Sequence, residues 1–394
     1  MLIKKGIKMK LPKIIDKILS IIGYILSFLP YIALGGYAAS AATGYFEEEN
    51  IGGELIIMGI LVFLGVLFLY AHIIIHEGGH LVMGLLSGWK YSSFRVGNLT
   101  LVKQDGKMKW KKTTVAGTGG QCLMIPPECE PEKCPFFLYL LGGGLFNIVT
   151  GCIALLIAFY VHSIAASVLT VFAIIGIGLG LSNLFPAKMG GTMNDGYQIF
   201  IEFPRNKESK KYNYLLLSSH AALTNAETTK DIPEKLRNAV LSADYSDLSD
   251  TGCANLYCVK ASLLQDDGRY EECREIYQRI ADSPDTLEIF KNEAKCELMY
   301  FEIMDECNAE KIDALYDKKL AEYIKVTALY PSRKRLMYAY YLIYKKDEAK
   351  AEEEYNALTK AAQTHPVKAE GAIDLKEAER VKKHYENRRN QQEA

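Results

Sequence analysis

Long runs of apolar residues fill the first half of the chain, and a mixed polar pattern fills the second. Neither Lys nor Arg occurs between Ile18 and Trp89, or between Pro135 and Ala187. A membrane-spanning helix needs about 20 consecutive apolar residues. Four stretches meet this requirement, at about 18–42, 55–86, 136–162 and 164–186. The pattern therefore predicts a mainly α, polytopic membrane protein with about four transmembrane helices, followed by a soluble part.

The first apolar stretch follows the basic segment MLIKKGIKMK, as the apolar core of a signal peptide does. A signal-peptide core has about 7–15 apolar residues, and this stretch is much longer. We interpret it as a retained transmembrane helix that follows a basic arm at residues 1–17.

Basic residues are concentrated in particular connections between the four stretches. The arm 1–17 contains six lysines, whereas the loop 44–53 contains three glutamates and no basic residue. The loop after the second stretch is again rich in Lys and Arg. Because basic loops stay in the cytoplasm, the pattern predicts an integral protein of the cell membrane with both termini cytoplasmic.

Residues 89–134 have the alternating pattern of strands, not the spacing of a helix. Apolar and polar residues alternate on both sides of Asp105-Gly106, a dipeptide typical of a tight hairpin turn. We expect a small β-hairpin insertion on the cytosolic side, within a membrane domain that extends over residues 18–205.

Residues 206–394 have helical spacing and are rich in Glu, Lys, Ala and Tyr. The window 254–284 has the pattern of a tetratricopeptide repeat (TPR), with Gly268 at the turn between two helices, and 336–366 repeats it weakly. We expect a cytosolic TPR-like domain of helical hairpins. A helical domain without true repeats is the alternative.

The second apolar stretch contains AHIIIHEGGH, which places His76 and His80 on one face of a helix with Glu77 beside them. Two imidazoles four residues apart are a zinc-binding pattern. Zinc lowers the pKa of a bound water to about 7, and Glu77 would take its proton as general base. The pattern also occurs by chance in soluble helices, but each such group costs about 2 kcal/mol or more in lipid if it has no partner.

Two histidines leave zinc one protein ligand short. Asp195 is the first acidic residue after Glu132 and follows the fourth apolar stretch in NLFPAKMGGTMNDG, where glycines let the backbone turn back. We therefore expect one zinc ion per chain, held by His76, His80 and Asp195. An ordinary helix-capping Asp is the alternative.

HEGGH and the later Asn, Pro, Asp and Gly resemble the two motifs of the site-2 protease family of intramembrane zinc metalloproteases, over about residues 55–200. The resemblance implies a core of three transmembrane helices, the same three ligands and a catalytic Glu77. The interval from Pro186 to Asp195 is longer than the family's. A glycine-rich stretch with an asparagine also resembles the family, and Asn147 is then a candidate contact to substrate or to the oxyanion.

Charge and cysteine content exclude some other classes. The net charge of −1 argues against a nucleic-acid partner, which requires clustered Lys and Arg. The nine cysteines are an odd number and widely spread, which favours reduced thiols. Cys129 and Cys134 have a spacing that could form half of a zinc site, but no second pair lies nearby.

These observations favour a zinc-dependent endopeptidase that cuts a peptide bond in or near a transmembrane segment of another membrane protein. The alternative is a catalytically silent adaptor that recruits cytosolic proteins through its helical domain. A zinc transporter is a third class, and it requires polar ligands on more than one span. The expected partners are a transmembrane substrate, the lipid bilayer and a protein bound to the C-terminal domain.

Overall fold

The computed structural model describes residues 13–45, 51–112, 118–161, 164–243 and 247–393. Most of the predicted basic arm 1–17 therefore lies outside the described residues. The chain forms two compact units, Met1–Tyr91 with Gly119–Lys210, and Ser92–Thr118 with Lys211–Ala394. Most of the predicted β-rich loop thus belongs to the same unit as the C-terminal helices.

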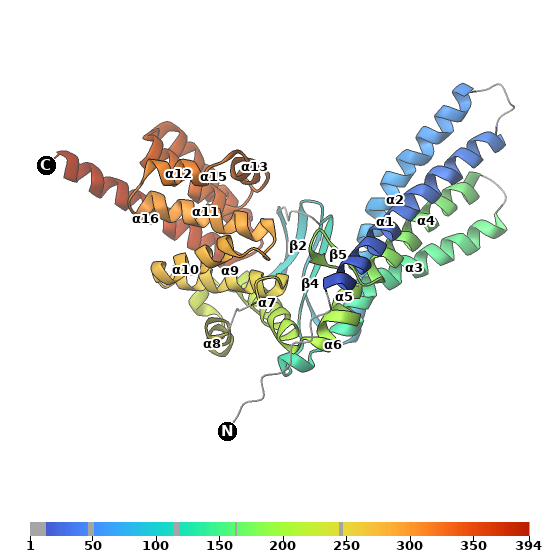
Figure 1. The fold of residues 1–394 in the computed structure, drawn as a ribbon, viewed down its shortest axis with the longest axis horizontal. Helices are drawn as coiled ribbons and strands as arrows, with labels where there is room; N and C mark the ends of the chain where they lie inside the picture. Colours follow the sequence, from blue (N-terminus) through green and yellow to red (C-terminus); the bar gives the residue numbers. More distant parts are fainter. Residues whose placement is uncertain (1–12, 46–50, 113–117, 162–163, 244–246, 394) are drawn as a thin grey trace. The chain divides into compact units, whose positions relative to one another are not determined.

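Four long apolar helices form the first unit (Figure 1). They are α1 (Lys13–Tyr45), α2 (Ile51–Leu86), α3 (Phe136–Tyr160) and α4 (Ile164–Leu184). Each contains a stretch long and apolar enough to cross a membrane, which confirms the four predicted helices in the part of the chain described. Large apolar side chains are exposed, among them Phe63 and Phe159, as expected of a surface that faces lipid.

Glycines allow these helices to pack closely. The backbones of α2 and α3 meet at Gly79 and Gly142, where a Cβ on either residue would overlap the other's carbonyl group. Gly144 on α3 likewise makes room for Leu184 on α4. Small residues at helix contacts are typical of packing in membranes, and here they bring the polar part of α2 against α3.

Short elements complete the first unit. These are β4 (Gly120–Ile125), a 3-10 turn (Pro131–Lys133), β5 (Lys188–Met189), β6 (Thr192–Met193), α5 (Asp195–Tyr197), a π-helical turn (Gln198–Glu202) and α6 (Phe203–Arg205). Strand β4 packs along α2, and β5 pairs with β6 as a two-stranded hairpin after α4.

An antiparallel meander is formed by β1 (Lys90–Val96), β2 (Leu99–Gln104) and β3 (Lys107–Lys112). The predicted turn at Asp105-Gly106 is present, and both residues have positive φ, as the tight turn between β2 and β3 requires. The small antiparallel sheet predicted from the alternating pattern is therefore confirmed.

The second unit contains most of the remaining helices. These are α7 (Lys207–Asn225), α8 (Glu234–Ser242), α9 (Thr251–Asp266), α10 (Tyr270–Asp282), α11 (Glu288–Met304), α12 (Ala309–Leu315), α13 (Lys318–Val326), α14 (Pro331–Ala339), α15 (Glu348–Thr364) and α16 (Lys368–Glu393), with a 3-10 turn (Thr229–Asp231) and a π-helical turn (Tyr340–Lys345). They share one apolar core. Helices α9 and α10 form the helical hairpin expected at 254–284, and Gly268 between them has positive φ.

Candidate metal centre

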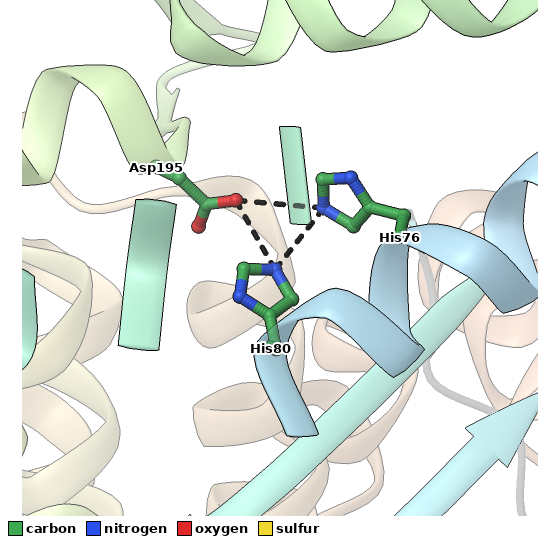
Figure 2. Close-up of side chains that lie close together, drawn as sticks. All are labelled: His76, His80 and Asp195. Carbon is green, nitrogen blue, oxygen red and sulfur yellow. Dashed lines mark hydrogen bonds and ion pairs between the residues drawn. The ribbon is translucent and has the colours of Figure 1, made fainter. Parts of the chain in front are cut away.

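His76, His80 and Asp195 converge on one point at the polar part of α2 (Figure 2). The Nε2 atoms of the two histidines are 3.1 Å apart, and Oδ2 of Asp195 lies 3.5 Å and 3.3 Å from them, respectively. Ligands about 2.0–2.1 Å from a tetrahedral ion are about 3.3–3.4 Å apart. The three predicted ligands therefore have the spacing that a small tetrahedral cation requires.

The hydrogen bonds of His80 determine which of its nitrogens can bind a cation. Its Nδ1 lies 2.7 Å from the carbonyl oxygen of Tyr139, which can only accept. Nδ1 of a neutral imidazole therefore carries the proton, and Nε2 presents its lone pair to the other two ligands. In this neutral form, nitrogen lone pairs and a carboxylate face one another, an arrangement that a metal cation stabilises when it takes the place of the imidazole protons.

A chain of hydrogen bonds reaches His76 at Nδ1, the nitrogen that does not face Asp195. The side-chain amide of Asn147 lies 3.3 Å from Nδ1 of His76 and 3.3 Å from Nδ1 of His72. Nε2 of His72 lies 3.0 Å from the carbonyl oxygen of Phe172 on α4 and so carries the proton of that ring. Nδ1 of His72 is then a hydrogen-bond acceptor, and the NH₂ group of an amide that faces it would be its donor.

The orientation of this amide decides the protonation of His76. The structure places Nδ2 of Asn147 next to Nδ1 of His76 and Oδ1 next to Nδ1 of His72. Rotating the amide by 180° exchanges the two atoms without moving the side chain, and its oxygen then accepts a hydrogen bond from Nδ1 of His76, the protonation that a ligand needs. Nε2 of His76 is then left with a free lone pair on the side of Asp195. His72 and Asn147 are fully buried, as expected of groups that hold a ligand in place.

Glu77 lies beside the three ligands without being one of them. Its carboxylate accepts a hydrogen bond from the backbone N–H of Cys122 on β4. A Cβ on Gly120 would come within 2.7 Å of Oε1 of Glu77, so the glycine leaves space for this carboxylate. The buried Glu77 is thus held between α2 and β4, with both histidines close by.

The β5–β6 hairpin accounts for the long interval between Pro186 and Asp195. Ala187 and Asn194, at its two ends, are joined by two hydrogen bonds of 3.1 Å each. The intervening residues form a separate loop, in which Gly190 has positive φ. Asp195 therefore follows the end of α4 closely in space although eight residues separate it from Pro186.

Asn194 fixes the position of Asp195. Its Oδ1 accepts from the backbone N–H of Tyr197 at 2.8 Å and caps the short helix α5. Its Nδ2 donates to the carbonyl oxygens of Ser182 and Phe185 at the end of α4. One side chain thus joins the end of the fourth span to the helix that begins with the ligand.

Helix α1 holds the same region from the other side. Asp16 accepts hydrogen bonds from Tyr197 at 2.6 Å and from Lys188 at 3.2 Å, and the hydroxyl of Tyr24 accepts from the N–H of Gly190 at 2.8 Å. Burial and the hydrogen bond to Asp16 raise the pKa of Tyr197 well above its usual range. Helix α1 therefore stabilises the position of the segment that carries Asp195.

The electrostatic environment keeps Asp195 ionised. Burial by itself would raise the pKa of this carboxyl, but with no metal ion bound, the charges and hydrogen bonds of protonated His80 and His76 outweigh burial and hold the pKa well below its usual range. An ionised carboxylate is the form that binds a metal ion.

Sequence reasoning named the residues that converge here but not most of the residues that support them. His76, Glu77, His80 and Asp195 lie together as expected, and Asn147 lies beside them. The supporting contacts of Tyr139, Asn194 and Asp16 were missed. Asn194 had a local signal, because Asn directly before a helix is a typical N-cap, whereas the other two contacts join distant parts of the chain.

In the part of the chain that the structure describes, no other group of three His, Cys, Asp or Glu side chains is close enough to hold a metal ion. Comparisons with protein-family models, with curated proteins and with solved structures found no match for this chain.

Proposed function

We propose that this chain is a zinc-dependent intramembrane endopeptidase that resembles the site-2 proteases. The observation that carries the proposal is the convergence of Asp195 with His76 and His80 at tetrahedral spacing, with Glu77 beside them. The two histidines and Glu77 lie on a helix apolar enough to cross a membrane. Ionisable groups inside a membrane are costly and mark a functional site by default.

Zinc is the ion that the donor set favours. Two imidazole nitrogens and one carboxylate oxygen form a three-ligand set typical of catalytic zinc, which keeps a fourth position open. When bound, zinc would act as a Lewis acid that acidifies a water molecule and polarises the carbonyl group of the substrate. Calcium and magnesium prefer sets of oxygen ligands and fit this site poorly.

Glu77 provides the proton transfer that peptide hydrolysis requires. The carboxylate takes a proton from the attacking water as the water oxygen bonds to the peptide carbonyl carbon. It then gives the proton to the peptide nitrogen as the carbon–nitrogen bond breaks. The N–H of Cys122 on β4 orients the carboxylate.

The expected substrate is a transmembrane segment of another protein, because the site lies within a stretch of α2 that is apolar enough to be in the bilayer. A helix protects its peptide bonds, so the substrate must unwind locally before Glu77 can act on it. The proposed activity is therefore that of a protease of regulated intramembrane proteolysis.

We assign the helical unit a role in binding a cytosolic protein partner, as a TPR-like domain, with both termini in the cytoplasm and the protein in the cell membrane. The accessible thiol of Cys129 provides a check of this topology. An impermeant thiol reagent should label Cys129 only after intact cells are opened, and labelling from outside would contradict the orientation.

A silent adaptor would have no use for Glu77, since a purely structural zinc site does not need a base. The two functions are separated by Glu77→Gln in the full chain, purified in detergent. We expect about one zinc per chain in wild type and variant, and cleavage of a labelled single-span peptide by wild type alone. His76→Ala with His80→Ala should lose both properties. Wild type without zinc, or Glu77→Gln as active as wild type, would contradict the protease function.

A further inference from the structure

The two faces of the β1–β3 meander differ in what covers them. On β2, Thr100, Val102 and Gln104 point to one face and are almost fully buried. Gln104 donates to the carbonyl oxygen of Thr224 at 3.0 Å, and Lys111 on the same face donates to that of Gln363 at 2.5 Å. This face is thus packed on the helices of its own unit.

The opposite face has an apolar row that crosses all three strands. The register pairs Phe94 with Leu101, and Leu101 with Trp110. Because paired residues in antiparallel strands point to the same side, these three side chains form one continuous row. The row becomes more exposed towards β3, where Trp110 is 70% exposed.

Neighbouring rows extend this face and add positive charge. Leu99 and Met108 are 49% and 51% exposed and lie on either side of the central row. Leu99 is paired with Lys112, and Met108 with Lys103, and both lysines are exposed. This face therefore combines an exposed tryptophan and other apolar side chains with two lysines, and none of its described residues on β1, β2 and β3 is acidic.

A short connection joins the sheet to the second apolar helix. Strand β1 begins at Lys90, four residues after α2 ends at Leu86, and four residues span at most about 14 Å. The segment Met58–Leu86 of α2 is apolar enough to cross the bilayer. Tryptophan is enriched at membrane interfaces, and lysines close to a cytoplasmic leaflet are attracted to its anionic lipids.

We infer that this apolar and basic face, formed by Phe94, Leu99, Leu101, Lys103, Met108, Trp110 and Lys112, docks on anionic lipid headgroups of the bilayer that contains the protein's own spans. Trp110 and Met108 enter the headgroup layer, and Lys103 and Lys112 pair with lipid phosphates. A protein partner would bury the same side chains but would not require anionic lipid.

The chain contains two tryptophans, so fluorescence can test the docking directly. Trp89 is 2% exposed and packs against Tyr139, whereas Trp110 is exposed. The full chain is reconstituted in nanodiscs of phosphatidylcholine, alone or with one quarter phosphatidylglycerol, with brominated or ordinary acyl chains. Subtracting the emission of Trp110→Phe isolates the signal of Trp110.

We expect brominated lipid to lower the Trp110 signal by about two-fold or more in the anionic nanodiscs, and much less in the neutral ones. Lys103→Gln with Lys112→Gln should abolish this difference. The matched control is Lys382→Gln with Lys383→Gln, two exposed lysines on α16, which should leave it unchanged.

Three outcomes would overturn the inference. A Trp110 signal that is insensitive to brominated lipid would leave the face to a protein partner. Equal quenching in neutral and anionic nanodiscs would remove the role of anionic lipid. Unchanged quenching in the Lys103 and Lys112 variant would show that these lysines do not bind the headgroups.

Discussion

A Cβ on Gly143 would lie 2.5 Å from Nε2 of His80 and 2.6 Å from Nε2 of His76. These are the two nitrogen atoms that face Asp195, so the glycine on α3 leaves open the space next to the metal ligands. Any larger residue at this position must displace the imidazoles or an ion that they bind.

We therefore predict that Gly143→Ala lowers zinc content from about one per chain to near zero, although alanine favours a helix more than glycine does. Gly78→Ala is the matched control, because a Cβ on Gly78, next to the site in sequence, meets no atom within 4 Å. Metal analysis of both variants checks the prediction. Equal zinc in the two would show that the space next to Gly143 is not part of the metal centre.

Asn147→Ala should weaken zinc binding by about 10–100-fold, as the loss of a residue that orients a metal ligand typically does. The variant removes the amide that lies between His76 and His72. A direct contact to the oxyanion, the role suggested by the sequence, would instead lower kcat and leave zinc affinity unchanged. Zinc titration together with cleavage kinetics separates the two roles. Thr170→Ala on α4, away from the site, should change neither.

Asn194→Ala should weaken zinc binding through the position of Asp195. It removes the hydrogen bonds that join Ala187, the end of α4 and the first turn of α5. We expect about a tenfold loss of zinc affinity, and a loss of about 1 kcal/mol of stability for the missing cap. Asn206→Ala removes the cap at Ser209 N–H in the same unit and should lower stability alone. Unchanged zinc affinity in Asn194→Ala would contradict this role.

The ligands were predictable from sequence because two of them need only local geometry. Residues four apart on a helix share a face, so HEGGH predicts the relative positions of His76 and His80 without knowledge of the fold. Asp195 was predictable by elimination, as the first acidic residue after a long uncharged stretch. The hairpin at Asp105-Gly106 likewise depends on local turn chemistry.

The supporting contacts depend on packing between distant segments, which spacing alone does not reveal. His72 looks like one more histidine on α2 until α3 and α4 bring Asn147 and Phe172 to its ring. The longer interval before Asp195 looks like a departure from a motif. The two ends of the β5–β6 hairpin are hydrogen-bonded to each other, and the hairpin also contacts α1. These contacts keep Asp195 in place despite the added residues.

His365 should make the stability of the helical unit depend on pH. Burial lowers the pKa of this side chain and outweighs the hydrogen bond to Val367 and the charge of Asp374, which raise the pKa. The folded state therefore keeps His365 neutral at a pH where the unfolded chain, with a pKa of about 6.5, takes up a proton. The free energy of unfolding is therefore highest above that pKa. It falls as the pH decreases below it, by at most about 1.4 kcal/mol per pH unit.

The variant His365→Asn cannot titrate, so it should lose less stability than wild type between pH 7.5 and pH 5.5. Hydrogen exchange of amides in α15 and α16, corrected for intrinsic rates, measures the opening free energy at each pH in the full chain. If the difference in opening free energy between wild type and variant is the same at both pH values, His365 is not the group that causes the pH dependence. A difference that shrinks as the pH falls identifies the buried imidazole as the source of this acid sensitivity.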